Sequence, residues 1–397
     1  MLKALVVIIA VVFVLFIAGL LFRYRKAFNF LRIALGIKHN QDPHSNSEVA
    51  IYDLDAAPGV RVVPEWEHAL GILVGYPFQL PLAMLREAAK DALLFITVNS
   101  LRRQRRCTEK LRRHGVNLDN TRFITTKQHI GYYGTRDWGP YTVIDNGRVS
   151  LADANYHDYP FSGYDSGGKI DWLTDSIPLF TLTHENAAPA EVAQLLHAER
   201  RELKIALTGG AVMFDGKGTL LVNQLVIDEN RTMGVSFEEL KRILAKCLGV
   251  RRLIVLPNYE GWGVQHIDCL LKLLDEKRIL VKQLDSNHPD YERVETIARE
   301  LAKVEGPDGE PYEILRLRTP SYAPGMAAPY TNSFIFNNKV FVPNLDIPGD
   351  VGALETWKNS MPDYEVFGFT RDRGMHNWTY TDSLHCRTKA LFVPYGG

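Results

Sequence analysis

Apolar stretches of strand length alternate with longer amphipathic segments over most of the chain beyond residue 60. Short runs rich in Val, Ile, Leu and Phe, bounded by polar or turn residues, predict strands. The strands predicted in this way are LGILVGYPF (70–78), FITVN (95–99), GTLLVNQLVI (218–227), RRLIVLPN (251–258) and KRILVKQL (277–284).

Amphipathic segments between these runs predict helices. SFEELKRILAKCLG (236–249) begins with a serine cap and a glutamate three residues later, and it ends at Gly249. The other predicted helices are LPLAMLREAAKDALL (80–94), the segment that ends with TEKLRRHG (108–115), and YERVETIARELAKV (291–304).

Two hairpins are also predicted. TVIDNGRVSLAD (142–153) turns at Asn146-Gly147, and NSFIFNNKVFVPN (332–344) turns at Asn337-Asn338. Asn and Gly tolerate the positive φ that a two-residue hairpin turn requires. Hairpins interleaved with helices indicate a mixed α/β sheet assembly and not a doubly wound parallel sheet.

The N-terminus has a different pattern. Residues 4–22, ALVVIIAVVFVLFIAGLLF, contain no polar side chain, and RYRK follows them. At about 1.5 Å per residue this stretch nearly crosses a hydrocarbon layer of about 30 Å. A cleaved signal peptide has a shorter apolar region and a small-residue cleavage site. We therefore expect residues 1–26 to be an uncleaved, single-pass transmembrane helix that anchors the protein in a membrane.

Positive charges flank this span unequally. Arg23, Arg25 and Lys26 outweigh Lys3, which tilts the main domain towards the cytoplasm by the positive-inside rule, although a large domain can be translocated against such a bias. Residues 27–60 contain the polar stretch KHNQDPHSNSE and are interpreted as a linker. Residues 61–397 are interpreted as one large domain.

Composition narrows the function classes. Lys and Arg number 46 and so do Asp and Glu, and no basic stripe is present, so no nucleic-acid partner is expected. The densest basic segment, LRRQRRCTEKLRRHG (101–115), has helical spacing and is interpreted as a solvated helix face. The cysteines at 107, 247, 269 and 386 form no CxxC pair, so we expect no disulfide framework, no metal site and no cofactor.

Cys386 lies in the polar, turn-like segment YTDSLHCRTKALFV (380–393), where a structural cysteine is out of place. A thiol attacks as its thiolate and needs a cationic or basic neighbour. His385 is adjacent, but in an extended backbone it points away from Cys386 and is interpreted as a packing or hydrogen-bonding residue. In GWGVQHIDCLLKLLD (261–275), His266 and Asp268 share one face if the segment is a strand, and Cys269 then faces away into the core.

Two further motifs precede these. YYGTRDWGPYTV contains Arg136, Asp137 and Trp138 in a compact loop before a strand. LTGGAVMFDGKGTLLV (207–222) contains a Gly209-Gly210 pair and places Asp215 in a hairpin turn. Its glycines lack the spacings of the dinucleotide and P-loop fingerprints, which excludes a phosphate-binding loop.

RDWGP, TGG with DGKGT, QHID, PYTNSFIFNNKVFVPN and DSLHCRT occur together, in this order, in one known superfamily. The chain resembles the guanidine-modifying (pentein) superfamily, which includes agmatine deiminases and peptidylarginine deiminases. Within it the chain is more similar to the Porphyromonas-type bacterial peptidylarginine deiminase than to agmatine deiminase. The resemblance covers most of residues 60–393 and implies a five-bladed α/β propeller fold.

The resemblance also implies roles for individual residues. Cys386 is then the nucleophile, His266 is the general acid and base, and Asp137 and Asp268 are the carboxylates that hold the substrate guanidinium. Asn332, in the YTNS motif, matches an active-site position. The loop of Asp137 also carries Trp138, which is expected to wall the pocket.

The substrate stays open at this stage. Gly209-Gly210-Ala211 stands where the family often has GGN, and residues 154–165 lack the arginines with which the Porphyromonas-type enzyme holds a substrate's terminal carboxylate. A preference for C-terminal arginine is therefore not expected. The sequence predicts a cysteine-dependent deiminase that converts peptidyl arginine to citrulline. Alternatives are a deiminase of agmatine or another small guanidine, and a catalytically silent, membrane-tethered binding module.

Overall fold

The computed structural model describes residues 48–126, 134–156, 183–260, 265–323, 325–378 and 382–392. The predicted transmembrane helix (1–26) lies outside these residues, as does most of the predicted linker. Among the described helices, none has the length and apolar character that a membrane span requires.

Five of the sheets share one plan. An antiparallel pair of strands is followed by one or two helices, and the next strand pairs in parallel with the second strand of the pair. Four of these units are continuous in sequence. The first contains β6 (Tyr141–Asp145), β7 (Arg148–Asn155), α6 (Thr183–Leu195) and β8 (Glu199–Ala206). The second contains β9 (Val212–Phe214), β10 (Thr219–Asn223), α7 (Gln224–Thr232), α8 (Phe237–Leu248) and β11 (Arg252–Leu256). The third contains β12 (Leu271–Leu273), β13 (Arg278–Gln283), α9 (Tyr291–Leu301) and β14 (Glu313–Arg318), and the fourth contains β17 (Phe334–Phe336), β18 (Lys339–Asn344), α10 (Gly349–Ser360) and β19 (Glu365–Thr370).

The fifth unit joins the two ends of the described chain. Its first strand, from the C-terminal end, pairs antiparallel with a strand near the N-terminal end, and two parallel strands continue the sheet. In sheet order with their intervening helices, the elements are β20 (Lys389–Leu391), β3 (Gly71–Gly75), α2 (Leu82–Ala88), β4 (Leu93–Val98), α3 (Leu101–Arg113) and β5 (Thr121–Thr125).

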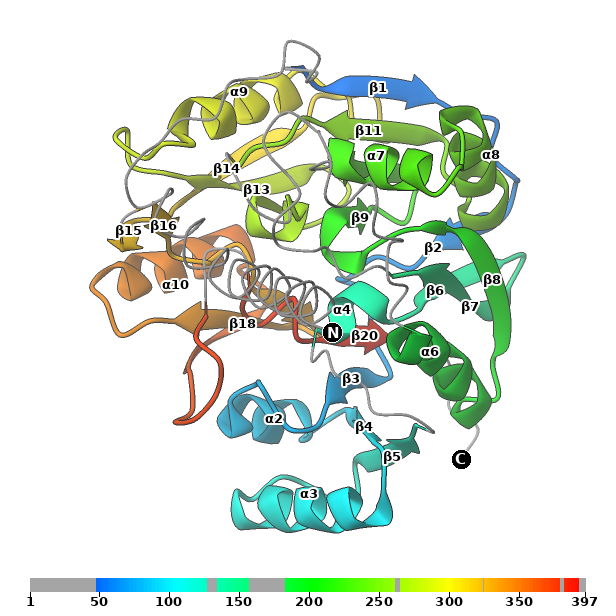
Figure 1. Cartoon of the computed structure of the whole chain (residues 1–397). Coiled ribbons are helices and arrows are strands. Elements are labelled where there is room, and N and C mark those ends of the chain that lie inside the picture. Colours follow the sequence, from blue (N-terminus) through cyan, green and yellow to red (C-terminus); the bar gives the residue numbers. More distant parts are fainter. Residues whose placement is uncertain are drawn as a thin grey trace, which may run out of the picture.

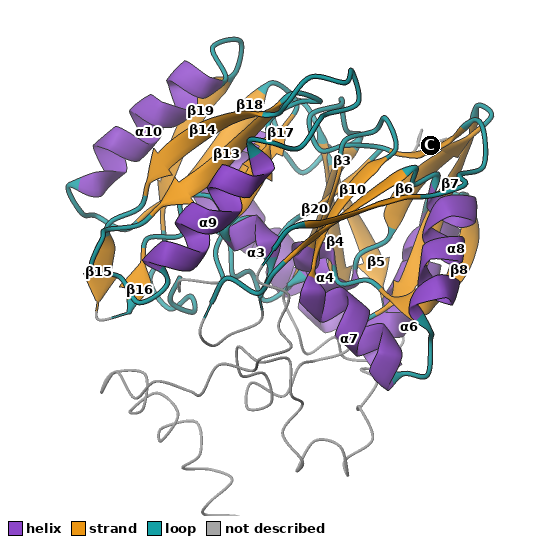
Figure 2. Ribbon diagram, turned by 90° about the horizontal axis from the view of Figure 1, so that it is seen from above, coloured by secondary structure: helices purple, strands orange, loops and turns teal. Residues whose placement is uncertain are grey.

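The units follow one another around the molecule in sequence order, with β3–β5 at the bottom of Figure 1, β6–β8 at the right and β9–β11 above them. The units of β13 and β18 occupy the left side. Helices lie towards the outside: in Figure 2 the strands are seen between α10 on one side and α6 and α8 on the other. The prediction of a mixed α/β sheet assembly is confirmed.

Two short strands extend these sheets at their edges. β1 (Ala50–Asp53) pairs antiparallel with β11, and β2 (Val60–Val62) pairs antiparallel with β6. Part of the predicted linker (27–60) therefore belongs to the folded domain, because the backbone of residues 50–53 completes the hydrogen bonds of a sheet edge. β15 (Ser321–Ala323) and β16 (Met326–Ala327) form a separate small ladder.

Both predicted hairpins are present. Asp145 pairs with Arg148 across Asn146-Gly147, and both turn residues have positive φ, 48° and 84°. β17 and β18 are joined by Asn337 and Asn338, with φ of 43° and 60°. These values match the turn that suits the right-handed twist of paired strands.

The predicted bounds of a helix agree with the structure where capping residues fix its ends. Ser236 accepts a hydrogen bond from Glu239 N at the start of α8, and Gly249 ends the helix in the left-handed conformation with φ 69°. The predicted strand 218–227 is wrong in its second half, because β10 ends at Asn223 and α7 begins at Gln224. A continuous apolar run does not distinguish a buried strand from a buried helix.

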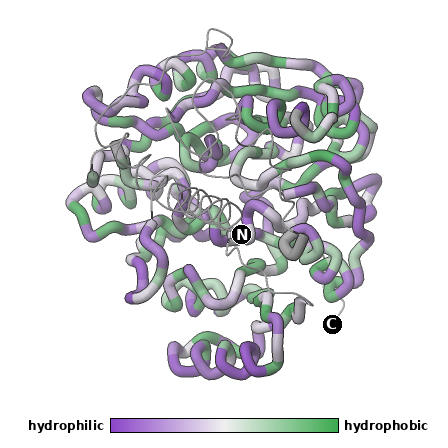
Figure 3. Tube along the Cα trace, in the orientation of Figure 1, coloured by the Kyte–Doolittle hydropathy of each residue, from purple (hydrophilic) through white to green (hydrophobic). Residues whose placement is uncertain are grey.

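Parallel strands buried on both faces explain the unbroken apolar runs. Along β4, Leu94 and Ile96 pack with α2 and α3, whereas Phe95 packs on the other face against Leu73 and Trp138. The basic helix α3 buries only Cys107 and Leu111, and Figure 3 shows it hydrophilic along most of its length. The interpretation of this segment as a solvated helix face is confirmed.

Candidate active site

Five of the predicted site residues come together from four short, irregular segments. Asp137 lies on the short helix α4 (Thr135–Trp138), and His266 and Asp268 lie at the start of the 3₁₀ helix η2 (Ile267–Cys269). Asn332 precedes β17, and Cys386 lies in a turn before β20. All five side chains are buried. The predicted strand through His266 and Asp268 is wrong; a tight 3₁₀ turn carries the pair instead.

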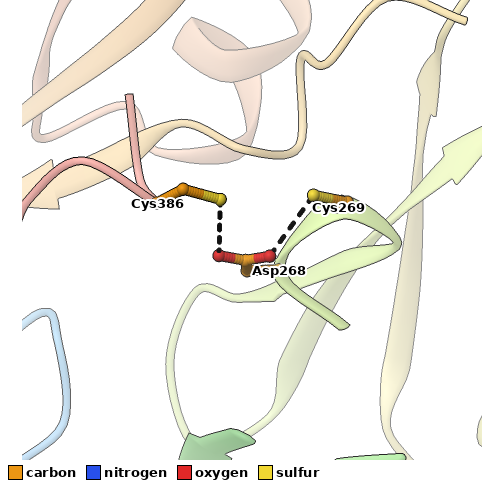
Figure 4. A group of neighbouring side chains, drawn as sticks. All are labelled: Asp268, Cys269 and Cys386. Atoms are coloured by element: carbon orange, nitrogen blue, oxygen red, sulfur yellow. Dashed lines mark hydrogen bonds between the residues drawn. The ribbon is translucent and has the colours of Figure 1, made fainter. Parts of the chain in front are cut away.

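Asn332 fixes the position of the Cys386 thiol. Its Nδ2 donates to Cys386 Sγ at 3.2 Å, and its Oδ1 accepts from Cys386 N at 3.3 Å and from Ser383 N at 3.0 Å. One amide thus holds both the backbone and the sulfur of the turn. Asp268 Oδ2 lies 3.6 Å from the same sulfur (Figure 4).

The environment of Cys386 keeps its thiol protonated at neutral pH. A hydrogen bond with Cys269 lowers its pKa, but burial and the charges of Asp268, Asp382 and Asp137 raise it, and the result is about 12. A carboxylate beside a thiol disfavours a second negative charge. Activation therefore requires a cation that offsets these carboxylates.

Cys269 belongs to the site, although the strand interpretation placed it in the core facing away. Its Sγ lies 3.3 Å from Asp268 Oδ1 and accepts from Asn332 Nδ2 at 3.3 Å. Figure 4 shows Asp268 between the two sulfurs, with one carboxylate oxygen towards each. Donor atoms of Asp268, Cys269 and Cys386 all lie within 4.8 Å of one another, a set that could hold a soft cation such as Zn²⁺.

His266 faces the second carboxylate of the site. Its Nδ1 lies 3.7 Å from Asp137 Oδ1, and Gly210 N donates to the same oxygen at 3.1 Å. A Cβ on Gly210 would stand 2.4 Å from His266 Nδ1 and 3.0 Å from Asp137 Oδ1. The residue must therefore be glycine for the imidazole and the carboxylate to approach, which explains one glycine of the TGG motif without a phosphate ligand.

A buried chain of charged groups supports Asp268 from behind, and the sequence did not reveal it. His385 Nδ1 lies 2.6 Å from Asp268 Oδ2, and His385 Nε2 lies 2.6 Å from Glu65 Oε2. The segment 384–387 is a turn and not extended, so His385 and Cys386 both reach the same carboxylate oxygen. Glu65 is 320 residues away in sequence, and no motif marks it.

The imidazole of His385 thus lies between two carboxylates. Burial and the charges of Arg136 and Lys272 lower the pKa of His385, although the charge of Glu65 and the hydrogen bond with Asp268 raise it. Burial by itself would raise the pKa of Asp268, but the hydrogen bond and charge of His385, with His266 and Lys272, lower it to about 2. Asp268 is therefore ionised and oriented at neutral pH.

Comparisons with known proteins identify the family. The family model of the Porphyromonas-type peptidyl-arginine deiminase matches residues 61–391. The chain belongs to this family. Its members hydrolyse a C–N bond of a guanidino group, and the chain is accordingly a hydrolase of guanidines within the pentein superfamily. The recognition of the family from the RDWGP, QHID and DSLHCRT motifs is confirmed.

Relatives of this deiminase include agmatine deiminases. The agmatine deiminase of Medicago truncatula is 23% identical over 306 residues, which are 68% of this chain and 78% of the relative. That of Ectopseudomonas mendocina is 24% identical over 305 residues, 70% of this chain and 78% of the relative.

Solved structures show the same fold. A putative arginine deiminase from Porphyromonas gingivalis superposes with a TM-score of 0.65 at 23% identity, over 84% of this chain and 98% of that one. The agmatine deiminase of Enterococcus faecalis gives a TM-score of 0.65 at 18% identity, over 84% and 96% of the two chains.

Two other predicted residues of the deiminase take structural positions. Trp138 is buried in the cluster with Leu73 and Phe95, so its role as a pocket wall stays a prediction. Asp215 caps the turn between β9 and β10, where its Oδ1 accepts from Lys217 N and Thr219 N at 2.8 Å each. The interpretation of Asp215 as a turn residue is confirmed.

Proposed function

We propose that this deiminase converts the guanidinium of peptidyl arginine to the ureido group of citrulline, with Cys386 as the nucleophile. The observation that supports this proposal is the contact of 3.6 Å between Cys386 Sγ and the ionised carboxylate of Asp268. Asp137 and His266 form a second contact pair in the same candidate site. The carboxylate of Asp268, which lies beside the protonated thiol of Cys386, can bind the cationic guanidinium of a substrate.

The two carboxylates suit a guanidinium. This cation is planar and presents a fork of N–H donors, which carboxylates accept in pairs. We assign Asp137 and Asp268 to opposite edges of the cation. The substrate then brings a positive charge between the two carboxylates, and this charge favours the thiolate of Cys386. The site is thus activated by its own substrate.

The reaction follows from these positions. The thiol proton of Cys386 passes to solvent as the substrate cation binds. The thiolate then forms a bond to the central guanidinium carbon, protonated His266 gives a proton to the departing nitrogen, and ammonia leaves as that C–N bond breaks. His266, now neutral, takes a proton from water, whose oxygen attacks the thiouronium carbon. The C–S bond breaks, thiolate is regenerated and a ureido group remains. A group that titrates near neutral pH is required for both proton transfers.

The substrate class is tested with the purified full-length chain in detergent. Ammonia release is compared for an arginine-containing peptide, free arginine and agmatine. We expect the peptide to give the highest kcat/KM. Turnover of agmatine alone would replace this proposal by the second candidate, which the agmatine deiminases among the relatives favour. No turnover of any guanidine would favour the silent binding module.

The proposed grip of Asp137 gives a first prediction. Asp137→Asn removes one charged acceptor of the guanidinium and should lower kcat/KM roughly 30- to 150-fold, about 2–3 kcal/mol of transition-state stabilisation. Asp215→Asn is the matched control, because Asp215 is equally buried but caps a turn away from the thiol. If both variants keep wild-type kcat/KM, Asp137 does not hold the substrate.

Two larger features remain part of the proposal. The five repeated units are interpreted as the blades of one α/β propeller. Residues 1–26 are proposed as a single-pass anchor, with the catalytic domain on the cytoplasmic side. Extraction of membranes with alkaline carbonate tests the anchor, and protease protection in sealed vesicles tests the side. Release of the protein by carbonate would contradict the anchor.

A further inference from the structure

A cavity of about 60 Å³ adjoins the candidate active site. It is lined by Arg136 and His385, which immediately precede Asp137 and Cys386 in the chain. The described residues that line it include none of Asp137, His266, Asp268 and Cys386. The cavity is therefore a separate space, and it shares its wall with the backbone that positions the proposed catalytic groups.

Three buried cations face this cavity. Lys272 on β12 is 1% exposed, Lys389 on β20 is 5% exposed, and Arg136 on α4 is 8% exposed. The one carboxylate among the lining residues is Glu65. A buried charge is tolerated when it is paired, because removal from water costs several kcal/mol otherwise.

Both carboxylate oxygens of Glu65 already have partners. Its Oε1 accepts from Ile335 N at 2.9 Å and lies 3.4 Å from Lys272 Nζ. Its Oε2 lies 2.6 Å from His385 Nε2 and 3.3 Å from Arg136 Nη2. The one carboxylate of Glu65 thus contacts Lys272, Arg136 and His385 together, and its charge acts on Lys389 only at longer range.

Lys389 makes no hydrogen bond or ion pair with a carboxylate within the described part of the chain, although the charges of Glu65 and Asp137 act on it at longer range. Its Nζ lies 3.8 Å from the centre of the Tyr141 ring, which is its one assigned contact. Arg136 Nη2 is buried without a hydrogen-bond acceptor in the same part of the chain. Two N–H donor groups from different units therefore border one cavity with unused hydrogen-bonding capacity.

We propose that this cavity binds a small inorganic anion of the halide class, held by Lys389 Nζ and Arg136 Nη2. About 10–15 Å³ of such space suffices for one water molecule, so the cavity is large enough for chloride or bromide. Much of the remaining wall is apolar, including Val62, Val212 and Leu273, which suits a weakly hydrated anion. The anion supplies the counter-charge that Glu65 cannot provide to all three cations.

The glycine of the RDWGP motif makes this site possible. A Cβ on Gly139 would stand 2.8 Å from Lys389 Cγ and 2.5 Å from Thr135 O. Only glycine leaves room for the lysine stem to pass α4 and bring its Nζ to the Tyr141 ring. The same motif that carries Asp137 thus also admits Lys389.

Thermal unfolding of the full-length chain in detergent tests the anion site. Melting is followed in sodium chloride and in sodium gluconate at equal ionic strength, since gluconate is too large for the cavity. We expect Tm to rise with chloride concentration and to saturate, because a ligand that binds only the folded state stabilises it. Lys389→Met should abolish the chloride-dependent rise.

Lys241→Met is the matched control, because Lys241 Nζ also lies over an aromatic ring, 4.8 Å from the Phe237 centre, on the surface helix α8. It should keep the wild-type response to chloride. If Lys389→Met does not fold, bromide-soaked crystals of the wild type decide, with an anomalous peak expected between Lys389 Nζ and Arg136 Nη2. Equal Tm in the two salts together with no such peak overturns the proposal. Neither readout depends on enzymatic activity.

Discussion

At the scale of single residues, the environment of Cys386 is the most informative feature. The thiol is held by Asn332, contacts one carboxylate and lies beside a second thiol. In this setting the Cys386 thiol is protonated at neutral pH, because its pKa is about 12. In the proposed mechanism, unproductive reactions of the sulfur are thereby suppressed until a cationic substrate enters.

Opposite effects are expected from two neighbours of this sulfur. Asp268→Asn removes a charge that raises the pKa of Cys386, so alkylation of Cys386 by iodoacetamide at pH 8 should become faster, about tenfold per unit of pKa. Cys269→Ala removes the hydrogen bond that lowers this pKa and should slow the reaction. Peptide mass spectrometry measures the labelling rate of Cys386. Changes in the same direction for both variants would contradict the assignment of these electrostatic effects.

Sequence motifs identified the candidate site residues that belong to recognisable patterns. They did not reveal residues that reach the site only because of the local backbone conformation or the folding of distant segments. Cys386, His266 and Asp137 stand in recognisable motifs. His385 was interpreted as pointing away from Cys386 because an extended backbone was assumed, and the turn brings both onto Asp268. Glu65 could not be found at all, because only the folded chain brings it to His385.

At the scale of elements, predictions held where a short-range cause acts. Asn146-Gly147 sets its own hairpin, and Ser236 with Gly249 sets the ends of α8. The 3₁₀ turn at His266 has no such local mark, and neither does the change from strand to helix after Asn223. Packing against other units decides these conformations.

The close approach of η1 (Gly209–Ala211) to η2 gives a prediction at this scale. Gly210→Ala places a Cβ 2.4 Å from His266 Nδ1, so the imidazole must move and kcat/KM should fall roughly 100-fold, as expected for a misplacement of about 1 Å. Gly352→Ala in α10 is the control, since no atom lies within 4 Å of its added Cβ. It should retain activity and gain about 0.5–1 kcal/mol of stability. Full activity of Gly210→Ala would show that the position of His266 is not critical.

At the scale of the whole molecule, five repeats of one strand and helix plan place the site. The proposed catalytic residues come from segments between the repeated units, and β20 brings the Cys386 turn from the C-terminal end to β3. The α/β class and the separate hairpins could be predicted from local patterns. The five-fold repetition could not, since no period of sequence similarity marks it; the propeller was expected from family resemblance alone.

Buried carboxylates at the centre of the molecule predict a pH dependence of stability. The pKa of Asp268 is lowered from 3.8 to about 2, so its contribution, on the order of 2 kcal/mol, is complete above pH 4 and is lost as pH falls towards 2. Asp268→Asn should therefore lose less stability than the wild type between pH 5 and pH 2.5. Urea midpoints at several pH values measure this difference.

Asp55→Asn is the control for this experiment, because its carboxylate is 96% exposed on the surface. It should follow the wild-type pH profile. Parallel profiles of the wild type and Asp268→Asn would mean that Asp268 is not held in its ionised form by His385 and its neighbours.

The central claim is that Cys386 forms a covalent bond to the guanidinium carbon of the substrate. Acid quenching during turnover of the best guanidine substrate, followed by mass spectrometry of the Cys386 peptide, tests it directly. The account predicts a thiouronium adduct on Cys386 and no ammonia release by Cys386→Ser. Sustained turnover by Cys386→Ser, with no adduct on the wild-type peptide, would contradict it.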